Sequence, residues 1–161
     1  MIVLLTIMAI AAVDAFGYWT HRALHQSWTG RLHRAHMTHH LVLYPPTDFV
    51  SDKYRHAGSD NTTWTFLALG LPLLCSPLLV ALTGLIGWIT AFWLVGVLGG
   101  SGLLHSFIHD WLHLKVHWFH WIPGAKRLVE LHKIHHVDMS KNFGIFSFCW
   151  DKLGKTFEDI R

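Results

Sequence analysis

The stretch His132-Lys133-Ile134-His135-His136 decides the fold, because its H-x-x-H-H pattern places three histidines on one face of a helix. The same pattern occurs earlier in the chain, at His36-Met37-Thr38-His39-His40. Each copy is expected to present its three imidazoles to one point. Two further pairs have helical i, i+4 spacing, and the four clusters together contain ten histidines, enough for two metal ions: His21 with His25, and His109 with His113.

The composition is unusual for a soluble domain. Of 161 residues, 52 % are hydrophobic and only 14 % are charged, about half the usual charged share. The 9 Trp and 10 Phe residues are typical of a protein at a lipid–water interface. The net charge is only +3, and no Lys/Arg run alternates with aromatic residues, so a nucleic-acid partner is not expected.

Two apolar stretches predict membrane-spanning helices. Residues 1–20 have about the length of helix that crosses a bilayer, and no positive segment precedes them, so a membrane helix is favoured over a cleavable signal peptide. Residues 61–108 contain no Asp, Glu, Lys or Arg and are long enough to cross twice. They predict a transmembrane hairpin over about 63–108, broken at Ser76-Pro77 or at Thr83-Gly84, of which the second divides the stretch more evenly.

The positive residues predict the orientation of the chain. Every Lys and Arg lies outside the hairpin, on the same side as both H-x-x-H-H copies, and the positive-inside rule places that side in the cytoplasm. The predicted fold is therefore an all-α integral membrane protein with about three transmembrane helices and a cytoplasmic, histidine-rich helical metal domain. The chain is expected to form a single domain, 1–161, with metal-binding helices at about 31–40 and 109–136.

The ligand type restricts the chemistry. Neutral imidazole binds iron, zinc, copper or nickel, whereas calcium and magnesium prefer oxygen ligands. The sequence contains no H-E-x-x-H, G-x-S-x-G or G-x-G-x-x-G motif, so hydrolysis and dinucleotide binding are not indicated. A histidine-rich site beside a hydrocarbon stretch favours redox chemistry on lipids, with electrons supplied from outside the chain.

Other polar residues near the clusters could hydrogen-bond to the ligand imidazoles and orient them. Asp14 shares a helical face with His21 and His25, but a polar residue near a membrane end explains it equally well. The remaining candidates have structural or interfacial explanations too, and they are His33, His105, Asp110 and His117.

Several segments resemble the fatty acid hydroxylase / sterol desaturase superfamily. Tyr18-Trp19-Thr20-His21-Arg22-Ala23-Leu24-His25, followed by the first H-x-x-H-H, is similar to the opening of that superfamily. The later part is closer to its fatty acid 2-hydroxylase branch, and the resemblance covers nearly the whole chain, through Tyr44-Pro45-Pro46, His109-Asp110-Trp111-Leu112-His113, Phe143-Gly144-Ile145 and Trp150-Asp151.

This resemblance implies an integral membrane, O2-dependent hydroxylase of a lipid C–H bond, with a fatty-acyl chain as the first candidate substrate. It implies two iron ions, which zinc can replace, and no catalytic residue beyond the metal ligands. The electron donor would be a b-type cytochrome or a ferredoxin with its reductase. The implied ligands are His21, His25, His36, His39, His40, His109, His113, His132, His135 and His136.

Three departures from the family pattern leave the substrate open. The first pair is H-x-x-x-H, as in sterol desaturases, the chain is shorter than typical members, and His105 is additional. Compact carotenoid hydroxylases share the four-motif plan, so a carotenoid or sterol hydroxylase/desaturase is the alternative. A non-catalytic membrane zinc-binding or transport protein is a second alternative, although a transport path should place ionisable groups in the bilayer and 61–108 offers only His105.

Overall fold

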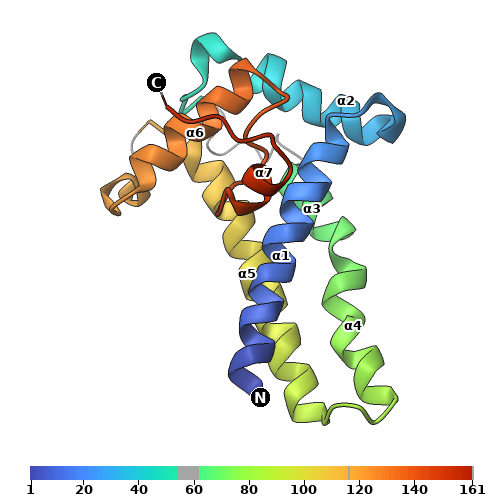
Figure 1. Cartoon of the computed structure of the whole chain (residues 1–161). Coiled ribbons are helices and arrows are strands. Elements are labelled where there is room, and N and C mark those ends of the chain that lie inside the picture. The colour runs from blue at the N-terminus through green and yellow to red at the C-terminus, as the bar shows by residue number, and fades with distance from the viewer. Residues whose placement is uncertain (54–61, 116, 161) are drawn as a thin grey trace.

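The computed structural model describes residues 1–53, 62–115 and 117–160, and within these ranges the chain is all-helical, with no strand. The predicted all-α class is therefore confirmed. The α-helices, coloured along the chain in Figure 1, are α1 (Ile2–Leu24), α2 (Arg31–Thr38), α3 (Thr62–Leu69), α4 (Leu71–Leu82), α5 (Trp88–Leu112), α6 (Ala125–Val137) and α7 (Cys149–Leu153).

Two of these helices are long and apolar enough to cross a membrane, α1 with 23 residues and α5 with 25. They pack against each other through a small core of Ala9, Val13, Leu94 and Leu98. Their outward faces carry large apolar side chains that stay exposed in the isolated chain, such as Leu4, Ile89 and Phe92. Helices that are apolar on all sides are typical of membrane spans.

The predicted hairpin breaks at the second of the two candidate positions. Helix α4 ends at Leu82, and Gly84 has a φ of 78°, a left-handed conformation that glycine adopts without a steric penalty. The other candidate, Pro77, remains inside α4. A break that the sequence analysis did not predict separates α3 from α4 at Gly70, where Pro72 in the first turn of α4 cannot donate a backbone hydrogen bond.

The first limb of the hairpin consists of α3 and α4. Among the described residues its apolar helical stretch covers Ala68 to Leu82, below the length of a full crossing, so the third crossing stays a prediction. Helix α5 packs against both α1 and α4 (Figure 1).

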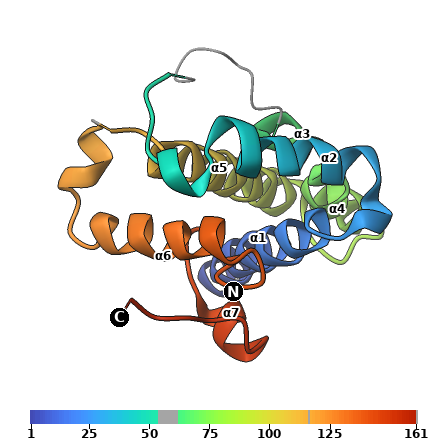
Figure 2. The ribbon, with the colours of Figure 1, turned by 90° about the horizontal axis from the view of Figure 1, so that it is seen from above.

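The histidine-bearing elements gather at one end of α1 and α5. Figure 1 shows α2, α6 and α7 at the end opposite the N-terminus, and Figure 2 looks down on this arrangement. Between α2 and the chain reversal at Pro45 lies a π-helical turn, η2 (His39–Leu43), in which the Tyr44 N–H donates to the His39 carbonyl over 2.9 Å. The helix predicted over 31–40 thus changes its winding at His39, inside the first H-x-x-H-H copy.

Candidate metal centre

The imidazoles gather into two groups of converging ring nitrogens. In each group, one nitrogen from every residue lies within 4.8 Å of one nitrogen from every other. The first histidine group consists of His21, His25, His36, His40 and His135, and the second histidine group consists of His39, His113, His132 and His136.

The expectation that each H-x-x-H-H copy points at one site is wrong, because each copy serves both groups. His36 and His40 belong to the first group and His39 to the second, whereas His132 and His136 belong to the second and His135 to the first. Residues i and i+4 differ by about 40° around a helix, but i+3 and i+4 differ by about 100°. The middle histidine of each copy, at i+3, therefore diverges toward a neighbouring site.

Ring nitrogens within the groups are spaced like ligands of one ion. Nε2 of His36 lies 2.9 Å from Nε2 of His25 and 3.1 Å from Nε2 of His40. In the second group, Nε2 of His132 and Nε2 of His113 are 3.2 Å apart. Metal–nitrogen bonds of about 2.0–2.1 Å place adjacent ligand nitrogens about 3.0–3.4 Å apart. The observed spacings therefore fit imidazoles that share an ion.

Several buried ring nitrogens make no hydrogen bond among the described residues. They are Nε2 of His21 and His136, and Nδ1 of His36, His40 and His132. A buried nitrogen lone pair that is left unpaired costs free energy, and a bound cation would satisfy the two Nε2 atoms. The donor set thus fits a pair of metal ions with nitrogen ligands.

Backbone carbonyls hold four of the rings in a defined tautomer. A carbonyl oxygen only accepts, so each of these rings carries its proton on Nδ1 and turns the Nε2 lone pair toward its group. The four bonds run from His21 to Phe143 (2.7 Å), His113 to Phe49 (3.0 Å), His135 to Lys141 (2.6 Å) and His136 to Tyr44 (2.8 Å).

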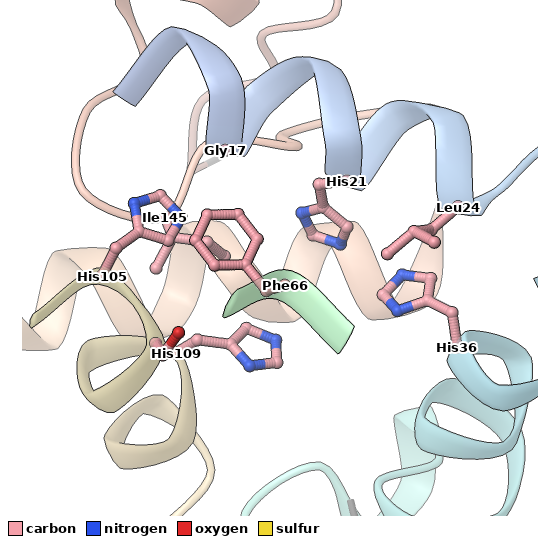
Figure 3. A pocket seen from close by; sticks show the side chains of 9 residues that line it. Gly17, His21, Leu24, His36, Phe66, His105, His109 and Ile145 are labelled. Atoms are coloured by element: carbon pink, nitrogen blue, oxygen red, sulfur yellow. The ribbon is translucent and has the colours of Figure 1, made fainter. Parts of the chain in front are cut away.

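A small apolar pocket, of about 30 Å³, opens beside the first group (Figure 3). Its apolar wall includes Leu24, Phe66 and Ile145, and His21 and His36 of the first group face it. An apolar wall with a few polar groups is typical of a site for an apolar ligand. The first group therefore borders an apolar recess.

The sequence profile described as Fatty acid hydroxylase matches residues 6–156. This chain belongs to the fatty acid hydroxylase family. The names of the family and of its relatives are those of oxidoreductase-type enzymes, hydroxylases and decarbonylases.

Relatives of this family member include three named proteins from plants and bacteria. The chain is 23 % identical over 150 residues to the very-long-chain aldehyde decarbonylase GL1-4 of Oryza sativa subsp. indica, covering 91 % of this chain but 22 % of that protein. It is 27 % identical over 137 residues to the beta-carotene hydroxylase of Pseudescherichia vulneris, covering 83 % of this chain and 67 % of that protein. It is 22 % identical over 163 residues to Protein CER1-like 1 of Arabidopsis thaliana, covering 98 % of this chain and 24 % of that protein. No solved structure matches significantly.

Nine of the ten expected ligands of this family member fall into the two groups, and His109 is the exception. Its ring centroid lies 4.8 Å from that of His39 and 5.0 Å from that of His132, and the residue lines the pocket. His109 therefore stands at the border between the second group and the pocket.

The five residues that were expected to orient the ligand imidazoles lie outside both groups. Asp14 accepts a 2.6 Å hydrogen bond from the Ser147 hydroxyl, which ties α1 to the C-terminal segment. The other four lie as follows: His33 donates from Nδ1 to the Leu24 carbonyl over 2.9 Å, Asp110 lies 3.7 Å from Nδ1 of His109, His117 accepts from the Phe119 N–H, and His105 stacks on Phe66.

The sequence analysis missed how the C-terminal segment supports the centre. Asp151 is fully buried, and its carboxylate accepts from the Phe143 N–H (2.8 Å), the Gly144 N–H (2.7 Å) and the Thr156 hydroxyl (2.7 Å). The Phe143 carbonyl in turn accepts from His21. The resemblance through Trp150-Asp151 was the available signal, but backbone carbonyls leave no trace in a sequence.

The histidines of the centre are expected to make the fold sensitive to acid. Burial, and then the neighbouring histidines, hold the pKa of His36, His40 and His132 well below the usual 6.5, and the same causes lower the pKa of His25 to about 4. The unfolded chain takes up protons below about pH 6.5 and the folded chain does not, so stability is complete above that pH and falls toward pH 4.

Thermal unfolding of the metal-free protein, followed across this range, checks the expectation. The Tm should be constant above about pH 7 and should fall steadily below about pH 6.5. A Tm that is unchanged down to about pH 4.5 would show that these imidazoles are not buried in neutral form.

Proposed function

We propose that this chain is a membrane oxygenase that hydroxylates a C–H bond of a lipid, with a fatty-acyl chain as the first candidate substrate. The observation that carries the proposal is the apolar pocket beside the first of two buried histidine groups. Redox chemistry on a hydrocarbon needs a metal site from which bulk water is excluded, and this combination supplies one.

The first and second histidine groups would each hold one iron ion, and zinc can occupy the same ligands. His109 would complete the second group. The pair His109 and His113 has the same i, i+4 spacing as His21 and His25, which supply two ligands of the first group. With His109 included, each group would receive one helical pair, a second pair from one H-x-x-H-H copy and a single histidine from the other.

When bound, two iron ions supply the redox chemistry that activates O2 with two external electrons. The protein would position the substrate and keep water out. Leu24, Phe66 and Ile145 would hold the acyl chain of the substrate against His21 and His36. The carbonyls of Phe143 and Tyr44 would keep the rings of His21 and His136 in place. The electrons would come from a b-type cytochrome or a ferredoxin with its reductase, on the cytoplasmic face of the membrane.

The relatives support two variants of this proposal. A hydroxylase or desaturase of a carotenoid or sterol is the alternative within the family, because the beta-carotene hydroxylase relative is matched over 67 % of its length. The plant relatives are matched over less than a quarter of theirs, so their named aldehyde chemistry is a weaker guide. Both variants use the same pocket and the same ligands.

Mass spectrometry of total lipids from a host that expresses the protein under 18O2 tests the proposal. A new lipid that carries one heavy oxygen is expected, and its identity would name the substrate. A new double bond without label would indicate a desaturase. No new lipid, with a compatible reductase and fatty-acyl, sterol and carotenoid substrates supplied, would favour the non-catalytic alternative of a zinc-binding or transport protein.

A further inference from the structure

Two polar side chains interrupt the apolar wall of the pocket. His105 and Ser106 are consecutive residues of α5, both line the pocket, and their exposed fractions are 7 % and 4 %. The Ser106 hydroxyl oxygen is buried and makes no hydrogen bond within the described part of the chain. The helical serine therefore does not take the usual solution of bonding a carbonyl one turn earlier.

The His105 ring packs closely against its neighbours. It stacks on Phe66 with ring centroids 5.1 Å apart and planes inclined by 5°. On its other side lies Gly17 of α1, where an added Cβ would come within 2.8 Å of the His105 Nε2. The glycine leaves the space that the imidazole occupies, so the two helices and Phe66 together form a slot for this ring.

Neither side chain belongs to the metal ligands. His105 lies outside both histidine groups, and none of the described residues makes a hydrogen bond to its ring nitrogens. A polar or ionisable side chain within a membrane helix marks a functional site by default. Figure 3 shows His105 at one side of the pocket and His36 at the other, with Phe66 between them.

We propose that His105 and Ser106 form a subsite for an oxygen atom of the lipid, either a hydroxyl or a carbonyl. The Ser106 hydroxyl would donate to that oxygen, and the imidazole would accept from a hydroxyl or donate to a carbonyl. The substrate would then be an oxygen-bearing chain rather than a bare hydrocarbon. The anchored oxygen would also fix which carbon faces His21 and His36, so the new oxygen would appear at a set distance from the first.

The inference rests on the proposed function, since it takes the pocket as the lipid site. Binding without turnover separates the two. Metal-loaded protein in lipid nanodiscs, kept free of O2, is equilibrated with labelled hexadecan-1-ol or labelled hexadecane, and partition into protein-free discs is subtracted. The native protein is expected to bind the alcohol at least about 10-fold more tightly than the alkane, because the alkane leaves both polar groups unpaired.

The variants remove the polar atoms while keeping the shape. His105→Phe retains a ring against Phe66, and with Ser106→Ala it should bring the two affinities within about 2-fold while the affinity for hexadecane is kept. Ser106→Ala alone removes one buried oxygen and gives the same comparison if the double variant does not fold. Ser76→Ala, on α4 with its hydroxyl bonded to the Leu73 carbonyl, is the control and should keep the native preference.

Equal affinities of the native protein for alcohol and alkane would overturn the subsite, as would an unchanged preference in the double variant. A preference for the alcohol without any oxygenated product under 18O2 would leave the subsite standing and reject the oxygenase. Oxygenated product together with equal affinities would support the oxygenase and reject the subsite.

Discussion

Replacing His36 with alanine is expected to abolish the oxygenated lipid product and to lower the metal content to one ion or fewer per chain. The His36 Nε2 lies 2.9 Å from that of His25 and 3.1 Å from that of His40, so it is close to two other ligands of the first histidine group. Substituting a residue that hydrogen-bonds to a metal ligand costs about 10–100-fold in metal affinity or activity. Loss of the ligand itself should cost at least about 100-fold.

The measurement pairs lipid mass spectrometry with elemental analysis of the purified protein. His120→Ala is the control, because it also removes an imidazole, a half-buried one that bonds the Trp111 carbonyl and lies outside both groups. The control should keep both its metal and its product. Persistent product from the His36 variant, with membrane insertion intact, would reject the ligand assignment.

Replacing Asp151 with asparagine is expected to destabilise the protein by about 3 kcal/mol or more and to weaken metal binding. Three donors converge on this buried carboxylate, from Phe143, Gly144 and Thr156. The asparagine amide has only one accepting oxygen, and its NH2 group would face a backbone N–H or hydroxyl donor. At least one of the three buried hydrogen bonds is therefore lost. The effect should reach the centre because the Phe143 carbonyl orients His21.

Thermal unfolding and metal content of the Asp151 variant check this expectation. Asp159→Asn is the matched control, since Asp159 is an exposed carboxylate that pairs with Arg127 over 2.7 Å, and such surface pairs contribute little. Native stability and metal content in the Asp151 variant would contradict the support that we assign to the C-terminal segment. A loss of stability with full metal retention would confine the role of Asp151 to the fold.

The features that follow from local sequence pattern could be predicted. Helical spacing placed His21 with His25 in one group. Gly84 follows the end of a helix and adopts a positive φ, which glycine does without a steric penalty. The all-α class followed from the same periodicity. These properties depend on neighbours in the sequence, which a single chain displays directly.

Features that depend on distant contacts could not be predicted in the same way. Helical spacing makes the i+3 histidine of each H-x-x-H-H copy diverge from the other two, but whether it meets a second set of ligands depends on where the other helices lie. The break at Gly70 had a weak signal in Pro72, hidden in a long apolar run. Asp14 reaches Ser147 rather than a ligand ring in the described contacts, a pairing across 133 positions that spacing cannot reveal.

The division of both H-x-x-H-H copies between the two histidine groups has a consequence for assembly. Residues on α6 serve both groups, as do those on the continuous segment formed by α2 and η2. An ion in either group would therefore order the backbone that carries ligands for the other group. The second ion would then bind with a smaller loss of conformational entropy. The two ions should load cooperatively, so that chains with a single ion stay scarce at intermediate metal concentrations.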